Sequence, residues 1–211
     1  MIAYLLAGLA GYLLGSLNFA ALVGRIKKIN FREVGTGNFG TMNVFRATQS
    51  ILWAGLTLLW DAGKGIASML IGYAASSMLG ADPELGKVVA GLAAIAGHNH
   101  SFLLEFKSGR GVATFLGTSV IVNPLITISW LLSWIPGYLV TGIMSVGQIL
   151  ASIYMPAFSL FLSRSPYELA YAFGAGLLML EAHLEKIKAI RSGEEPRNYW
   201  NLKSKKKVSY N

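Results

Sequence analysis

Long apolar runs alternate with short polar segments along the chain. Four of the runs cover residues 1–24, 49–79, 88–104 and 167–182. The first two exceed the roughly 20 apolar residues with which a helix crosses a bilayer. The pattern therefore predicts an all-α, polytopic integral membrane protein that contains no soluble domain of any size.

The longest apolar stretch, residues 112–162, determines how many crossings the chain makes. It is interrupted at Asn123-Pro124, at Pro136-Gly137 and around residues 142–147. Two helices here would give six crossings in total, and three short helices would give seven. Two helices here with no crossing afterwards would give five crossings in total. The last apolar run, residues 167–182, would then not cross the membrane.

The distribution of cations favours seven crossings, because cytoplasmic loops of membrane proteins carry an excess of Lys and Arg. With turns near Asn123-Pro124 and near residues 141–145, Lys87 and Arg164 face outward and Lys64 lies within the bilayer. The other 15 of the 18 Lys and Arg residues then face the cytoplasm. We therefore predict seven transmembrane helices, with the N-terminus outside and the C-terminus cytoplasmic.

Composition supports the membrane assignment and narrows the choice of partners. Hydrophobic residues make up 54% of the 211 residues and charged residues only 13%, against about 25% charged in soluble domains. The first run is not expected to be a cleaved signal peptide, because its cations follow it. The absence of cysteine excludes thiolate chemistry and disulfides. The formal net charge of +8 points to anionic partners such as lipid head groups or phosphates.

The first polar segment is rich in glycine and ends in an arginine. It reads Val34-Gly35-Thr36-Gly37-Asn38-Phe39-Gly40-Thr41-Met42-Asn43-Val44-Phe45-Arg46. Glycines let the backbone turn so that successive N–H groups point at one spot, which makes a nest for anions. An arginine adds a forked cation that grips phosphate. A simple connector is the alternative reading of such a loop.

A second segment places Lys107 and Arg110 around Gly109 and just before Gly111, ahead of an apolar helical run. N–H groups at a helix start and fixed positive charge suit a phosphate, although such cations can also simply mark a cytoplasmic loop. In the predicted topology both segments, the turn at residues 142–147 and the His183-Glu185 region lie on the cytoplasmic face. This convergence favours a phosphate site.

Asp61 and Lys64 stand three residues apart inside the second apolar run and therefore share a helix face. Charged groups within a membrane span are costly unless they are paired or line a cavity, which suggests a functional role. The alternative is an ion pair that joins two helices.

Taken in this order, the segments resemble the PlsY-type acyl-phosphate:glycerol-3-phosphate acyltransferases. The matching pieces are residues 14–16, 34–43 with Arg46, 61–65, 97–98, 106–114 and 183–185, followed by Gly193 and Glu194. The resemblance implies seven helices in the bacterial cytoplasmic (inner) membrane. It also implies transfer of a fatty acyl group from acyl phosphate to the 1-hydroxyl of glycerol 3-phosphate, giving lysophosphatidic acid for phospholipid biosynthesis.

We expect no cofactor and no metal ion, contact with membrane lipid, a monomer and no nucleic-acid partner. We expect residues 1–193 to form the membrane acyltransferase domain and residues 194–211 a polybasic cytoplasmic tail. The predicted catalytic residues are Thr36, Arg46 and His183. The predicted substrate- and phosphate-binding residues are Gly37, Asn38, Gly40, Asn43, Lys64, His98, Lys107, Gly109, Arg110, Gly111, Ser145 and Glu185.

Four segments of the chain depart from the family pattern. Thr36 stands where the family usually has Ser, and Ser108-Gly109-Arg110-Gly111 replaces Gly-Gly-Lys-Gly. Gln148 replaces a small residue, and Lys186 replaces an Asn. The last change turns an amide that donates and accepts into a donor-only cation. A non-catalytic or altered-acceptor paralogue is therefore one alternative, and a small transporter of phosphorylated anions is another.

The chain lacks the residues of covalent acyl transfer, since it has no cysteine and no G-x-S-x-G turn. An acyl phosphate is already activated, so we predict direct transfer to the acceptor hydroxyl. Either His183 or the donor phosphate would take the proton.

Overall fold

The computed structural model describes residues 1–195 and 197, and in that part of the chain every regular element is helical. The all-α prediction is confirmed. The helices are α1 (Ile2–Ser16), α2 (Phe19–Lys27), α3 (Thr41–Thr48), α4 (Ile51–Met78), α5 (Pro83–Asn99), α6 (Val112–Val122), α7 (Pro124–Thr141), α8 (Met144–Leu162), α9 (Pro166–Glu181) and α10 (Leu184–Arg191), with one 3-10 turn at Phe102–Leu104.

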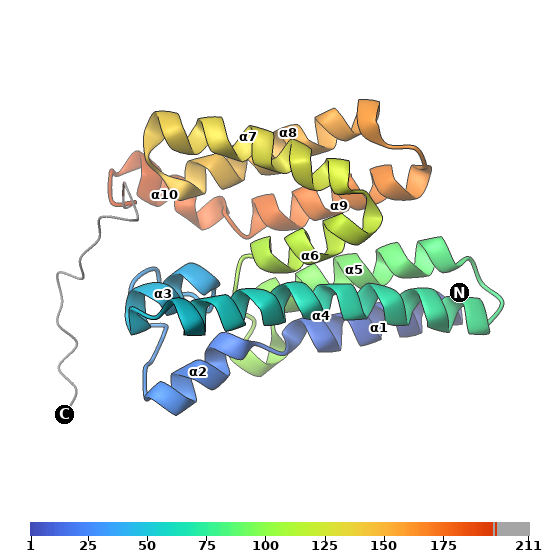
Figure 1. Cartoon of the computed structure of the whole chain (residues 1–211), viewed down its shortest axis with the longest axis horizontal. Helices are drawn as coiled ribbons and strands as arrows, with labels where there is room; N and C mark the ends of the chain where they lie inside the picture. Colours follow the sequence, from blue (N-terminus) through green and yellow to red (C-terminus); the bar gives the residue numbers. More distant parts are fainter. Residues whose placement is uncertain (196, 198–211) are drawn as a thin grey trace.

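The long helices form two layers (Figure 1). One layer contains α1, α4 and α5, and the other contains α7, α8 and α9. Helix α6 lies between the layers and contacts α4 and α7. The short helices α2, α3 and α10 gather at the end of the molecule opposite the N-terminus.

Three helices begin with the same local signal, a polar cap followed by proline. Asp82, Asn123 and Ser165 each accept a hydrogen bond from a backbone N–H of the first turn of α5, α7 and α9 respectively. Proline suits the next position because its missing N–H would have no partner inside the helix. Helix α7 ends at Gly142, whose φ of 69° is left-handed, and α8 begins at Met144. The predicted turns near residues 123–124 and 141–145 are thus confirmed.

Pro136 lies inside α7 and does not end it, in agreement with the predicted turns near residues 123–124 and 141–145. One interruption differs from the sequence prediction. The first apolar run, predicted as one span over residues 1–24, is instead broken at Leu17-Asn18 into α1 and α2. The reason is local, since the Asn18 side chain accepts from the Ala21 N–H at 3.1 Å and starts a new helix.

Three helical stretches of the described chain are long and apolar enough to cross a membrane by length and composition, namely Ile2–Lys27, Pro124–Thr141 and Met144–Leu162. Helix α6 has 11 residues and at 1.5 Å per residue reaches about 16 Å, roughly half of the hydrocarbon thickness of a bilayer. The count of seven crossings therefore stays a prediction.

Helices α1 and α5 approach closely along glycines of α1. A Cβ built on Gly11 would lie 2.2 Å from the Ala90 carbonyl oxygen, and one on Gly15 would lie 2.2 Å from that of Ala94. Small residues permit such approach between membrane helices.

Replacing Gly11 by alanine is expected to destabilise the fold by about 1–3 kcal/mol, because the added methyl group forces the two backbones apart. Gly55→Ala on α4 is the matched control, since a Cβ there meets no atom within 4 Å. The measurement is the free energy of unfolding in mixed micelles titrated with denaturing detergent. Equal values for the two variants would contradict close packing at Gly11.

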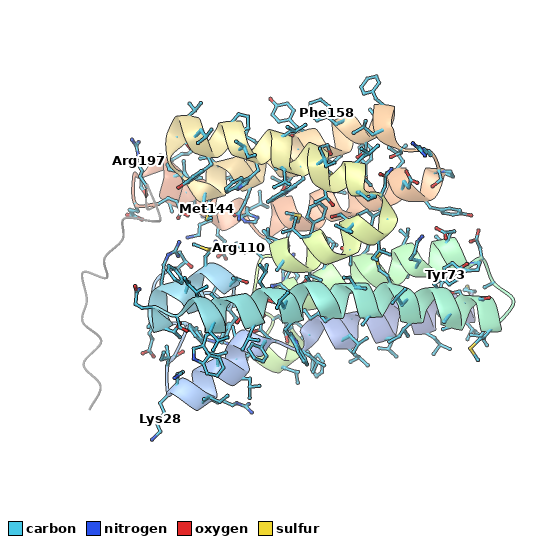
Figure 2. All side chains as sticks on the ribbon, viewed as in Figure 1. Lys28, Tyr73, Arg110, Met144, Phe158 and Arg197 are labelled. Atoms are coloured by element: carbon cyan, nitrogen blue, oxygen red, sulfur yellow. The ribbon has the colours of Figure 1, made fainter. Side chains whose placement is uncertain are left out.

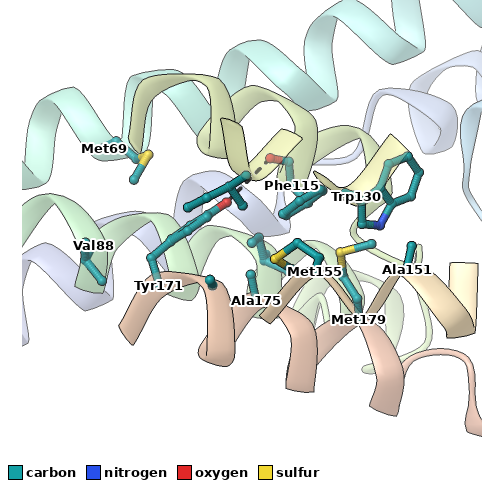
Figure 3. Close-up of a cluster of buried hydrophobic side chains, with 12 residues drawn as sticks. Met69, Val88, Phe115, Trp130, Ala151, Met155, Tyr171, Ala175 and Met179 are labelled. Carbon is teal, nitrogen blue, oxygen red and sulfur yellow. Dashed lines mark hydrogen bonds between the residues drawn. The ribbon is translucent and has the colours of Figure 1, made fainter. Parts of the chain in front are cut away.

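A buried apolar cluster joins the two layers (Figure 3). Tyr171 of α9 stacks on Phe115 of α6, with ring centroids 6.5 Å apart. Phe115 also packs against Trp130 of α7 at 5.8 Å. The Tyr171 hydroxyl pairs with the Thr118 hydroxyl at 2.6 Å, so the polar tip of this buried ring has a partner. The cluster holds α6 in place beside the cavity described next.

Candidate active site

A cavity of about 360 Å³ opens where the motif-bearing segments meet. Figure 2 shows Arg110 and Met144, which line it, in the space between the two layers near α3 and α10. Its polar lining is Thr36, Asn38, Thr41, Asn43, Arg46, Asp61, His98, Arg110, Ser145 and Gln148. Its apolar lining includes Met42, Leu58, Val112, Leu116, Trp130, Leu131, Trp134 and Met144. Three of the four segments that were predicted to converge, namely the two motif loops and the turn before α8, thus contribute to one cavity, and their place on the cytoplasmic side stays a prediction.

The loop before α3 is shaped by two asparagines. The buried Asn43 amide accepts from the Thr36 N–H at 3.0 Å and donates to the carbonyls of Phe31 and Asn38 at 3.2 and 2.8 Å. Asn38 in turn accepts from the Gly40 N–H at 3.1 Å. Asn43 therefore acts as a scaffold that fixes the loop from within.

This arrangement changes how the loop can meet an anion. The N–H groups of Thr36, Gly37, Phe39 and Gly40 all donate to protein acceptors, so they do not form the open nest that the glycines suggested. Side chains remain for recognition, since Thr36 Oγ1 accepts from Arg46 Nη1 at 3.4 Å and both residues line the cavity. Binding by Gly37, Asn38, Gly40 and Asn43 stays a prediction.

The second motif loop packs tightly between α5 and the first loop. Gly109 has no room for a side chain, because a Cβ would lie 1.8 Å from Nε2 of His98. Gly111 has a φ of 74° and begins α6. The Ser108 carbonyl accepts from the Phe39 N–H at 3.3 Å, and the Ser108 hydroxyl accepts from the Asn18 amide at 3.1 Å. These contacts bring Arg110 to the cavity wall.

A buried ionic cluster lies behind the cavity. The Lys64 ammonium lies 2.9 Å from an Asp61 carboxylate oxygen, 2.9 Å from His98 Nδ1 and 2.8 Å from the Leu17 carbonyl oxygen. That carbonyl is available because the first helix is broken there. An ammonium has three hydrogens, and three acceptors stand ready for them. Lys64 thus joins α1, α4 and α5, while its predicted part in substrate binding stays a prediction.

The last predicted catalytic residue, His183, lies fully buried between α9 and α10. Its Nδ1 is 2.7 Å from the Met179 carbonyl oxygen, and its Nε2 is 2.6 Å from the amide oxygen Oε1 of Gln148, a residue that lines the cavity. Burial lowers the pKa of His183 to about 4, and the positive charges of Arg110 and Lys186 act in the same direction. The imidazole is therefore neutral near pH 7.

A second contact set joins α8 to the segment after α10. The buried Glu195 carboxylate accepts from the Ser145 hydroxyl at 2.6 Å and from the Lys186 ammonium at 2.9 Å. Glu185 is exposed in the first turn of α10 and Lys107 is exposed in its loop, and neither belongs to the cavity lining. Their predicted roles stay predictions, and the predicted tail from residue 198 onward lies outside the described residues.

The apolar residues of the cavity lining and Gln148 were not among the site residues predicted from the sequence. The rings of Trp130, Trp134 and Tyr138 stack in succession along α7, at centroid distances of 6.1 and 5.2 Å. Their spacing of four residues was the available signal, since it places them on one helix face. For Gln148 the signal was an amide side chain within an apolar run. Its role could not be assigned without knowing that it contacts His183.

The family model described as glycerol-3-phosphate acyltransferase matches residues 5–193. The chain belongs to the glycerol-3-phosphate acyltransferase family. Relatives with that name share 36% identity in Roseobacter denitrificans, where the match covers 90% of this chain and 92% of the relative. In Rubrobacter xylanophilus the identity is 38%, over 89% and 91% of the two chains.

Solved structures of the glycerol-3-phosphate acyltransferase family agree in fold. The crystal structure of PlsY (YgiH), an integral membrane glycerol 3-phosphate acyltransferase, in its glycerol 3-phosphate form is 31% identical with a TM-score of 0.79, covering 92% of this chain and 94% of PlsY. Its lysophosphatidic acid form has 30% identity and a TM-score of 0.77 over the same shares. The resemblance inferred from the motifs is thus confirmed. Two of the residues that depart from the family pattern make side-chain contacts in the structure. Gln148 contacts His183, and Lys186 donates to Glu195.

Proposed function

We propose that this protein transfers a fatty acyl group from an acyl phosphate to the 1-hydroxyl of glycerol 3-phosphate, giving lysophosphatidic acid. The observation that carries the proposal is a single cavity with both kinds of lining. Arg46, Arg110 and Thr36 supply charge and a hydroxyl for phosphate groups, while Leu116 and Trp130 supply apolar surface for a fatty chain. The relatives named for this activity, and the PlsY structures with glycerol 3-phosphate and lysophosphatidic acid, support it.

The proposed chemistry is direct transfer without an acyl-enzyme. The acceptor hydroxyl oxygen attacks the acyl carbonyl carbon, the bond from that carbon to the phosphate oxygen breaks, and inorganic phosphate leaves. The hydroxyl proton ends on the phosphate. The protein's task is to hold two phosphate groups, to align the hydroxyl with the carbonyl and to stabilise the charge that develops as the anhydride breaks.

Arg46 and Arg110 are the proposed phosphate-holding cations, with Lys107 nearby in the chain. Thr36 and Ser145, which line the cavity, are proposed to orient polar substrate groups. His183 lies outside the cavity lining and is proposed to act through Gln148, which it contacts. Gly109 and Gly111 let the second loop pack so closely that Arg110 reaches the site. No cofactor or metal enters this scheme.

For topology, the proposal is a monomer that crosses the bacterial cytoplasmic membrane seven times with its N-terminus outside. The supporting observation is that the motif loops, α3 and α10 gather at the end opposite the N-terminus (Figure 1). Residues 1–193 would form the acyltransferase domain. Residues 194–211 would form a basic cytoplasmic tail on anionic lipid, worth about 1 kcal/mol per cation near the surface.

Single-cysteine labelling tests the orientation, because the chain has no cysteine of its own. Arg164 and Ser192 are both exposed and lie at opposite ends of the fold's last helices. A membrane-impermeant maleimide added to intact spheroplasts should label Arg164→Cys and leave Ser192→Cys unlabelled until the membrane is opened. The reverse result would place the N-terminus in the cytoplasm.

The activity test uses purified protein with palmitoyl phosphate and radiolabelled glycerol 3-phosphate. Lysophosphatidic acid should form, and should not form from a donor-free mixture. Retention of glycerol 3-phosphate without product would instead favour a non-catalytic paralogue. Passage of glycerol 3-phosphate across liposomes without an acyl donor would favour a transporter.

A further inference from the structure

The strongest unassigned feature of the site is the contact between Gln148 and His183. The two residues are 35 positions apart and come from α8 and the end of α9. Gln148 lines the cavity, whereas His183 is fully buried behind it. Gln148 is therefore the group through which the imidazole meets the substrate space.

The proton positions on His183 follow from its two neighbours. The Met179 carbonyl oxygen at 2.7 Å can only accept, so Nδ1 of His183 must carry a hydrogen. In the neutral imidazole Nε2 is then an acceptor, and the Gln148 Oε1 that lies 2.6 Å from it cannot donate. Oxygen and nitrogen of a glutamine amide occupy equivalent positions, and the hydrogen-bond network decides which faces the partner. The Gln148 NH₂ group must therefore face His183.

The alternative is a doubly protonated imidazolium that donates to the amide oxygen. The charged groups around His183 oppose it, since Arg110 in the loop before α6 and Lys186 on α10 both lower its pKa. Glu195, after α10, raises it, but burial is the largest influence and lowers it. The neutral form with Nδ1–H is the one these surroundings favour.

We propose that Gln148 is a positioning residue that occupies the Nε2 lone pair of His183 and turns its own amide oxygen toward the acceptor hydroxyl of the substrate. While this bond is made, Nε2 is not available to take the hydroxyl proton. His183 then orients Gln148, and Gln148 orients the alcohol. The inference rests on the proposed acyl transfer. In it, the amide oxygen of Gln148 recognises the primary alcohol of the acceptor.

Two substitutions separate this role from mere packing. Gln148→Met keeps the length of the side chain and removes the amide, and His183→Asn keeps a donor for the Met179 carbonyl and removes Nε2. Gln148→Met should lower kcat for lysophosphatidic acid formation about tenfold, the equivalent of one lost hydrogen bond, and leave KM for the acyl phosphate unchanged. In the His183→Asn background the same change should have much less effect, because the two side chains act as one unit.

A spectroscopic arm tests the arrangement without any need for activity. The side-chain ¹⁵N resonances of His183, assigned as those missing from His183→Asn, should show Nδ1–H and should not titrate between pH 5 and 8. In Gln148→Glu a carboxylate faces Nε2 and raises the pKa of His183, so the resonances should titrate in that range.

The outcomes decide between the proposal and its alternatives. Unchanged kcat in Gln148→Met, an equal loss in both backgrounds, or titration of the wild-type His183 between pH 5 and 8 would each overturn it. If the wild-type protein makes no lysophosphatidic acid, the proposed function fails, and the ¹⁵N measurement still decides whether Gln148 holds the ring.

Discussion

Replacing Arg46 by alanine is expected to lower kcat/KM for glycerol 3-phosphate by about 10²–10³-fold, because the variant loses a charge-assisted, forked contact to a phosphate group. Arg46 lines the cavity from α3, and its Nη1 lies 3.4 Å from Oγ1 of Thr36 in the preceding loop. Arg46→Lys should recover only part of the loss, since an ammonium keeps the charge and not the fork. Initial rates with palmitoyl phosphate as donor measure both variants.

Arg32→Ala is the matched control for Arg46→Ala. Arg32 lies two residues before the glycine-rich segment but on the surface, where it pairs with Glu105 at 3.1 Å and donates to the Leu104 carbonyl at 2.8 Å. An exposed pair of this kind contributes about 0–1 kcal/mol, so the activity of Arg32→Ala should stay within a few-fold of wild type. Similar losses in Arg32→Ala and Arg46→Ala would show that net charge, and not a phosphate contact, sets the rate.

Replacing Lys64 by methionine is expected to destabilise the fold by about 3–5 kcal/mol, because it leaves the buried Asp61 carboxylate without its cation. The same change removes the hydrogen bond from Lys64 to the Leu17 carbonyl at the break between α1 and α2. The free energy of unfolding in mixed micelles is the measurement. Adding Asp61→Asn to Lys64→Met should recover part of the stability, since no unpaired charge remains.

Lys87→Met provides the control for Lys64→Met with the same sequence geometry. Lys87 pairs with Glu84 three residues earlier on α5, as Lys64 does with Asp61 on α4, but Glu84 is about half exposed. We expect Lys87→Met to cost less than about 1 kcal/mol. A loss as small as this in Lys64→Met would contradict its role in joining three helices.

Local signals explain why much of the fold was predictable. The helix starts at Pro83, Pro124 and Pro166 follow from a polar cap and a proline, which need no distant partner. The break at Asn18 had the same kind of signal, but a single asparagine within 24 otherwise mostly apolar residues was outweighed by length. Pro136 lies inside α7, between the two predicted turns, because a proline within a membrane helix is tolerated where neighbouring groups satisfy the backbone.

The motif residues were predictable in kind but not in role. The glycine-rich loop was expected to offer N–H groups to an anion, yet asparagine side chains and backbone carbonyls accept from them. Glycine permits a turn, and the turn does not reveal whether its N–H groups point outward or are used within the protein. The cations Arg46 and Arg110 did reach the cavity, Arg46 from the last turn of α3 and Arg110 from the loop just before α6.

The sequence by itself determined an all-helical chain, the main turns, the family and several of the polar residues around the cavity, among them Thr36, Arg46 and Arg110. Apolar run length, capping residues and motif order are all written within short stretches of sequence, which is why these conclusions hold without coordinates. Only the tertiary structure decided that Lys64 reaches a carbonyl 47 residues away and that Gln148 meets His183 across 35 residues. Such contacts arise when helices pack, and no local preference records which side chains then face one another.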